Sequence, residues 1–123
     1  MRIIRKVTFW LPVFLLGSAA PTVFAQDAPT ASPEHYKVEF ENDQIRIIRI
    51  TYGPGEESPM HEHGNGVVIF LTESLVQFTL ADGTKPAPET TAAGVAAWAP
   101  AEKHAAKNVS DHAIEALMIE LKN

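Results

Sequence analysis

Apolar and polar residues alternate with a period of two from Tyr36 onward, which is the pattern of half-buried β-strands. In the range 36–41, Tyr36, Val38 and Phe40 alternate with charged residues, so one face of this segment is apolar. The range 45–52 is rich in β-branched residues, which fit best in a pleated sheet. The first part of the domain is therefore predicted to be two strands.

The rest of the chain repeats this pattern of short apolar segments between turn signals. Three further runs have the length of strands, at 67–72, 75–80 and 94–99. Asp82-Gly83 predicts a tight hairpin, because both central positions of such a turn favour positive φ. The range 113–121 fits both helical and strand spacing. We interpret it as a strand because the preceding elements are strands, and predict an all-β sandwich or barrel.

Residues 1–25 differ in character from everything that follows. They begin with a basic cluster of Arg2, Arg5 and Lys6. An apolar stretch and the small residue Ala25 follow, which is the order of a secretory signal peptide. The apolar run is shorter than the roughly 20 residues of a membrane-spanning helix. We expect cleavage after Ala25 and an exported protein, periplasmic or secreted, without a membrane anchor.

The remaining chain is acidic and lacks cysteine. The signal segment carries three basic residues and no acidic ones, so its removal lowers the formal net charge from −5 to −8. This balance, without a cluster of Lys or Arg, argues against nucleic acid and anionic membranes as partners. A small exported domain without disulfides must rely on packing, a metal or a second subunit, so a homodimer is expected.

The composition divides this remaining chain into two parts. Residues 26–34 are small, polar and interrupted by proline, and are interpreted as a flexible leader. Residues 35–122 then form one barrel domain. His35, at the boundary, has no partner nearby in the sequence.

The residues that carry chemistry lie in two stretches. Alternate side chains of a strand point to the same side, so His61 and His63 present two imidazoles to one face. Imidazole is a ligand that suits Fe, Ni and Zn. His-x-His alone is weak evidence, but a further histidine, His104, follows an apolar segment later in the chain.

Together the two stretches resemble the two motifs of the cupin superfamily. The first has glycine, five residues and His-x-His, at Gly55, His61 and His63. The second has glycine, five residues and proline, and then histidine and asparagine. These residues are Gly94, Pro100, His104 and Asn108. The turn from Pro100 to His104 is one residue shorter than is usual in the family.

The resemblance implies a cupin-type double-stranded β-helix, a jelly-roll barrel. It also implies one divalent metal, Fe, Mn, Ni or Zn, with His61, His63 and His104 as ligands and a small molecule beside it. The family's fourth ligand is a glutamate, which would fall at position 67 or 68. Val67 and Val68 stand there instead. Pro100 and Asn108 would be structural.

The missing carboxylate leaves several functions open. Three neutral imidazoles can still hold a metal and favour an anionic ligand, as in a metal-binding cupin or a mononuclear oxygenase (less readily an isomerase). Alternatively the barrel is a metal-free binding or sensing module. No catalytic acid or base is assigned, since none is visible beside the motif.

Three other side chains have a structural interpretation at this stage. Glu102 is expected to be an exposed turn residue, although its carboxylate could also reach toward the barrel mouth near the metal. Trp98 and Phe70 are expected to pack in the core, although either side chain would also suit a ligand pocket.

Overall fold

The computed structural model describes Gly17 and residues 26–122. Apart from Gly17, the predicted signal peptide lies outside the described residues. The described chain forms short strands and a single helical turn. In order these are β1 (Gln26–Asp27), α1 (Ala28–Ala31), β2 (Tyr36–Glu41), β3 (Ile45–Tyr52), β4 (His61–His63), β5 (Gly66–Phe70), β6 (Ser74–Leu80), β7 (Glu89–Thr91), β8 (Ala96–Ala99), β9 (Glu102–Asn108) and β10 (Ile114–Leu121). Among the described residues, no helix is long and apolar enough to cross a membrane.

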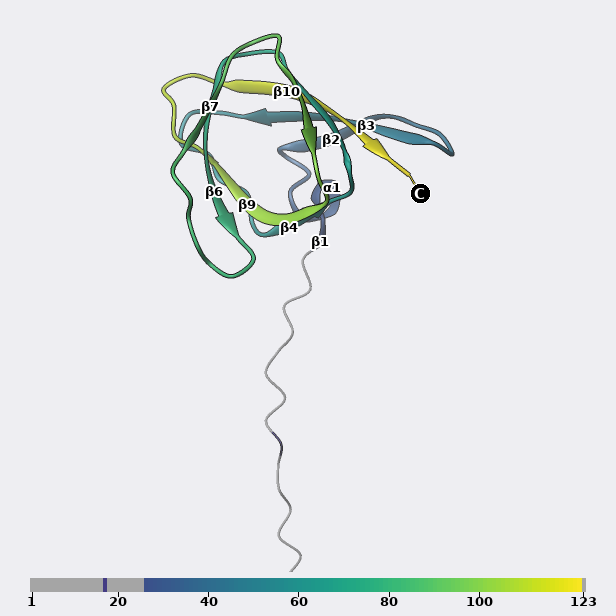
Figure 1. Cartoon of the computed structure of the whole chain (residues 1–123), viewed down its shortest axis with the longest axis horizontal. Helices are drawn as coiled ribbons and strands as arrows, with labels where there is room; N and C mark the ends of the chain where they lie inside the picture. The colour runs from purple at the N-terminus through teal and green to yellow at the C-terminus, as the bar shows by residue number, and fades with distance from the viewer. Residues whose placement is uncertain (1–16, 18–25, 123) are drawn as a thin grey trace, which may run out of the picture.

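The strands form two five-stranded sheets, which face each other across the interior of the barrel (Figure 1). One sheet has the order β1-β4-β9-β6-β7 and the other has β2-β3-β10-β5-β8. Every pairing is antiparallel except that of β1 with β4. The predicted all-β barrel with two sheets is therefore confirmed.

The strand interpretation of the C-terminal segment is also confirmed. β10 lies between β3 and β5 in the centre of its sheet. Ile114, Ala116 and Met118 are buried inside the barrel, whereas Leu117 and Ile119 between them are only half-buried on the outer face. This alternation has the period of a strand, and the helical spacing in the sequence was coincidental.

The core of the barrel is small and lies at one side of the interior. Its largest members are Ile48, Met118, Tyr36 and Tyr52. The buried residues of β9 and β10 include several alanines, which fill little space. The interior is therefore not closed by packing, and a cavity remains beside the core.

The interpretation of residues 26–34 as a flexible leader was wrong. β1 pairs with β4, and Ala28 is fully buried. The Arg46 side chain points inward from β3, and its guanidinium donates to both carboxylate oxygens of Asp27, at 2.8 and 2.7 Å. The same group donates to Glu120 at 2.7 Å. An inward-facing arginine needs such partners, and β1 supplies one of them.

His35 also has partners that the sequence did not reveal. Its Nδ1 lies 2.8 Å from Ser32 Oγ and its Nε2 lies 2.8 Å from Glu56 Oε2. The imidazole stacks on the ring of Tyr52 with the centroids 4.2 Å apart. These contacts attach the N-terminal segment to the loop that precedes β4.

Candidate metal centre

The structure brings the three motif histidines together. His61 and His63 lie on β4, and their alternate positions direct both rings to the inside of the barrel. β4 pairs with β9 so that His104 lies directly opposite His61. One nitrogen from each ring can be chosen so that all three lie within 4.8 Å of one another.

Hydrogen bonds determine which nitrogen of His61 is available. Its Nδ1 lies 2.9 Å from the carbonyl oxygen of Pro59, so Nδ1 carries the proton and donates it there. The lone pair of Nε2 then points at Nε2 of His63, 3.0 Å away. Two nitrogens that each bind one ion at about 2.1 Å lie roughly 3 Å apart, so this spacing fits a shared metal.

His104 is oriented in the same way by a carboxylate. Its Nδ1 lies 3.2 Å from Glu102 Oε2, which leaves Nε2 free to act as a ligand. The expectation for Glu102 was therefore incomplete. The residue is exposed, but it begins β9 rather than lying in a turn, and its side chain contacts a candidate ligand.

Burial keeps the three imidazoles neutral. Loss of solvation lowers the pKa of His61 to about 4 and that of His63 to about 3, and it also lowers the pKa of His104. Neutral rings retain the lone pairs that a metal needs. Among the described residues, the buried Nδ1 of His63 has no hydrogen-bond partner.

The position of the usual carboxylate is apolar on the inside of the barrel. Val68 lines the cavity together with His63 and His104, whereas Val67 faces outward opposite Trp98. The buried carboxylate of Glu120 is engaged elsewhere. It accepts hydrogen bonds from Arg46 and from the backbone N–H of Gly64, at 2.7 and 3.2 Å.

The other motif residues hold the backbone around the site. Gly55 and Gly94 have φ values of 75° and 84°, which disfavour a side chain at either position. The Asn108 amide donates to three backbone carbonyls, at 2.7 to 3.2 Å, which ties the end of β9 to the end of β3. The turn after Pro100 is anchored by the side chain of Asn65, which accepts from the Ala101 N–H at 2.7 Å.

Two tyrosines at the site were not identified from the sequence. The Tyr36 ring lies 4.7 Å from that of His61 and 5.3 Å from that of His63, centroid to centroid. Its hydroxyl lies 2.7 Å from that of Tyr52. Burial raises the pKa of Tyr36 and raises that of Tyr52 to about 12, so both phenols are neutral. Strand parity was the available signal, since Tyr36 and Val38 share the inward face.

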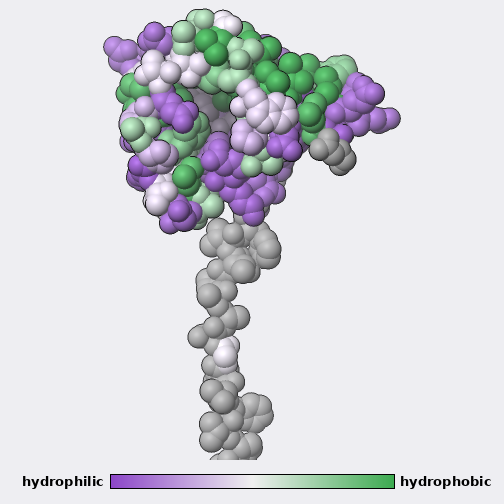
Figure 2. Space-filling view, viewed as in Figure 1, coloured by the Kyte–Doolittle hydropathy of each residue, from purple (hydrophilic) through white to green (hydrophobic). Residues whose placement is uncertain are grey.

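A cavity of about 480 Å³ opens beside the histidines. Figure 2 shows it as a hollow near the middle of the barrel surface that faces the viewer. The polar residues that line it are Tyr36, Tyr52, His63, Glu89, Thr91, Glu102, His104, Lys107 and Asn108. The remaining wall is mainly aliphatic and aromatic. It includes Ile50, Val68, Phe70, Val76, Phe78, Leu80 and Met118.

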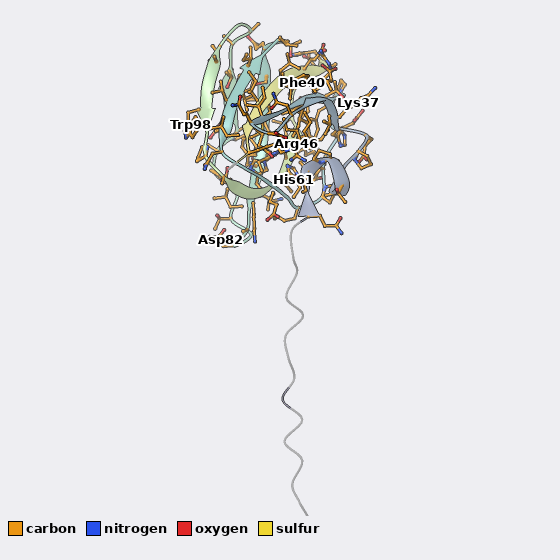
Figure 3. All side chains as sticks on the ribbon, turned by 90° about the vertical axis from the view of Figure 1, so that its right-hand side faces the viewer. Lys37, Phe40, Arg46, His61, Asp82 and Trp98 are labelled. Atoms are coloured by element: carbon orange, nitrogen blue, oxygen red, sulfur yellow. The ribbon has the colours of Figure 1, made fainter. Side chains whose placement is uncertain are left out.

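The expected core roles of Trp98 and Phe70 were wrong. Phe70 lines the cavity, and Trp98 lies at its rim with 59% of its surface exposed. Trp98 belongs to β8, an edge strand, so nothing in the described chain covers it from outside. In Figure 3, Trp98 lies at the margin of the barrel, whereas Arg46 and His61 lie within its body.

No protein-family model and no curated protein matches this sequence. Solved structures do match. A cupin domain from Bordetella pertussis superposes with a TM-score of 0.65 at 23% identity, covering 72% of this chain and 92% of that one. An RmlC-like cupin from Methanocaldococcus jannaschii, with a double-stranded β-helix, gives 0.55 at 17% identity over 70% and 77%. The chain has the cupin fold. The predicted fold class is thus confirmed.

A third match is an enzyme. The polyketide cyclase RemF from Streptomyces resistomycificus has a TM-score of 0.53 and 18% identity, covering 72% of this chain and 64% of that chain. At such identities the likeness concerns the fold alone. What this cupin barrel binds must therefore be inferred from its own three histidines and cavity.

Proposed function

We propose that this chain is an exported cupin that binds one divalent transition metal through His61, His63 and His104. A small molecule binds beside the metal in the barrel cavity. The observation that carries the proposal is the convergence of three neutral imidazoles, within 4.8 Å of one another, beside a cavity of about 480 Å³ that His63 and His104 line. Fe, Mn, Ni and Zn are the metals considered, since the ligand set does not select among them.

The cavity wall indicates the class of molecule that would bind. Most of the wall is apolar, which favours an aliphatic or aromatic body. Three neutral ligands leave the charge of a divalent cation uncompensated, which favours one anionic group such as a carboxylate or phenolate. When bound, the metal would act as a Lewis acid and as a template for that group.

The two phenols add a hydrogen-bond donor to this wall. Tyr36 and Tyr52 share one hydrogen bond between their hydroxyls, so the proton of the other hydroxyl is available to a ligand oxygen. Both residues line the cavity. Because both pKa values are raised, the phenols donate at neutral pH and do not act as anionic ligands.

An oxygenase is the second candidate. Three protein ligands leave coordination positions open, and the apolar wall limits access of water. A metal-free sensing module is the remaining alternative, and the apolar Val68 at the usual carboxylate position is the observation that favours it.

Metal analysis of the purified protein tests the proposal. Protein from metal-replete cells should contain about one equivalent of transition metal, and His63→Ala and His104→Ala should each lose it. His112→Ala is the matched control, because His112 is an exposed histidine outside the three-histidine cluster, and this variant should keep its metal. Protein without metal, or metal retained in both cluster variants, would overturn the metal site.

Two further measurements test the oxygenase alternative and the proposed export. Oxygen consumption over a panel of aromatic and aliphatic acids would divide the oxygenase from the binding protein. The mass of protein recovered from the periplasm or medium tests export. We expect a chain that begins at Gln26, where β1 also begins; an unprocessed chain retained in the cytoplasm would contradict export.

A further inference from the structure

The outer face of the β2-β3-β10-β5-β8 sheet carries an unbroken row of apolar side chains. Phe40 lies opposite Ile47, and Ile47 lies opposite Ile119. Ile119 lies opposite Val67, which in turn lies opposite Trp98. Directly opposed residues share one face of a sheet. The row, named here the apolar row, therefore crosses all five strands of this sheet.

More apolar residues flank the apolar row on the same face. Leu117 lies opposite Ile69, and Ile45 lies opposite Leu121. Phe40, at one end of the row, is 49% exposed, and Trp98, at the other end, is 59% exposed. A sheet with one face in water normally places polar residues there. In Figure 2, apolar side chains gather at the upper right, where Figure 1 shows β3 and β10.

The charged residues that flank the row neutralise one another within the chain. Arg49 makes ion pairs with Glu39 and Glu115, on the strands to either side of it. Lys37 lies opposite Arg49 at the edge of the sheet. These four residues carry two positive and two negative charges. The face is therefore nearly neutral on a chain that is acidic overall.

We propose that a second copy of this chain docks on this face, sheet against sheet, through the apolar row. On a nearly neutral face, two copies of an acidic chain can meet without like charges opposing each other. A basic partner would gain nothing from this face. A two-fold axis would place each row against the other, so each copy supplies the complementary surface.

The dimensions of the sheet are sufficient for such a dimer. Five strands spaced about 4.8 Å apart and a central strand of about 26 Å give a footprint of roughly 500 Å² per copy. The two faces then bury about 1,000 Å² or more, which is the lower bound of specific interfaces. The dimer would also compensate for the limited stability that a small core provides, because it buries apolar side chains that lie outside the barrel interior.

The interface does not depend on the proposed metal. The residues of the apolar row face outward, whereas the three histidines face inward. Metal-free protein should therefore be as dimeric as metal-bound protein. Loss of metal with retention of the dimer would separate a failure of the proposed function from a failure of this inference.

Sedimentation equilibrium of protein purified from cells that express the full chain tests the inference. The protein should be a dimer at about 10 µM, and Ile119→Lys should weaken the dimer by about 100-fold or more. Val109→Lys is the matched control. Val109 is an exposed apolar residue outside the row, 39% accessible, and this variant should remain dimeric.

A monomer at about 100 µM would overturn the proposal, as would equal dissociation of the Ile119 and Val109 variants. A monomer that sediments with lipid vesicles would also overturn it, because the face would then serve a membrane. Circular dichroism checks that the variants are folded. Should Ile119→Lys fail to fold, Trp98→Lys at the exposed end of the row provides the same test.

Discussion

His61 and His104 are direct register partners across β4 and β9, and their ring centroids lie 4.9 Å apart. This pairing explains why a turn that is one residue shorter than usual does not misdirect the third histidine. The aim of His104 is determined by the ladder between the two strands, and the chain between Pro100 and β9 only has to reach it. The position of the third imidazole is therefore a property of the sheet.

Val67 and Val68, which stand where the family has its glutamate ligand, allow a direct test of how the missing carboxylate affects metal affinity. Val68→Glu would place a carboxylate on the cavity wall with His63 and His104, so the affinity for a divalent metal should rise by about tenfold or more. Calorimetric titration of metal-free protein with Zn²⁺ or Ni²⁺ measures this change in affinity. Without metal, the buried carboxylate should lower the free energy of unfolding by about 2 kcal/mol.

Val67→Glu is the matched control for that variant. Val67 faces outward between Ile119 and Trp98, so a carboxylate there cannot reach the cavity. Its metal affinity should equal that of the unmodified protein. Equal gains in affinity from both substitutions would show that the effect arises from added negative charge and not from a ligand.

The same two residues show what the sequence could predict about the site. Period-two alternation placed His61 and His63 on one face, and the motif spacing added His104. The sequence did not decide whether position 67 or 68 faces the cavity, because parity across the loop from β4 to β5 depends on how Gly64 and Asn65 turn the chain. Gly66 packs so tightly that an added Cβ would lie 2.2 Å from the Ile119 carbonyl oxygen.

Long-range partners account for most of the errors in the sequence interpretation. The range 26–34 has the composition of a leader, and its order depends on Arg46, which lies 19 residues after Asp27. His35 likewise depends on Glu56, 21 residues later. Local composition carries no information about such contacts. The strands were predictable because their signal lies within each segment.

Glu102 is expected to position His104 for metal binding. Glu102→Gln keeps the size of the side chain but removes the charge that orients the imidazole, so metal affinity should fall by about 10- to 100-fold. Glu62→Gln is the control, because Glu62 faces away from the cluster and pairs with Lys103 at 3.7 Å. Competition with a chelator of known affinity measures both variants. Equal affinities would mean that the Glu102 contact does not orient the ligand.

Asp27 is expected to hold the N-terminal segment on the barrel. Asp27→Ala removes two charged hydrogen bonds from Arg46, which then retains only Glu120. We expect the free energy of unfolding to fall by about 1–2 kcal/mol, since the carboxylate is partly exposed. Urea denaturation measures the change. Asp111→Ala, at a fully exposed position, should change stability by less than about 0.5 kcal/mol.

The neutral imidazoles should make the metal-free protein sensitive to acid. The pKa values of His61 and His63 fall from 6.5 to about 4 and about 3 on folding, so the unfolded state binds protons first as the pH drops. Their contribution to stability is complete above pH 6.5 and is lost as the pH falls toward 4. Each histidine contributes a slope of up to about 1.4 kcal/mol per pH unit.

Urea denaturation of chelator-treated protein between pH 7 and pH 5 measures this slope. His63→Gln removes one of the three buried rings with lowered pKa values, so the slope should fall by about one proton per molecule. His112→Gln should leave the loss of stability toward acid in place, because the pKa of this exposed histidine is raised by the Glu73 carbonyl and by Asp111. An unchanged slope in His63→Gln would show that the buried imidazoles do not cause the acid sensitivity.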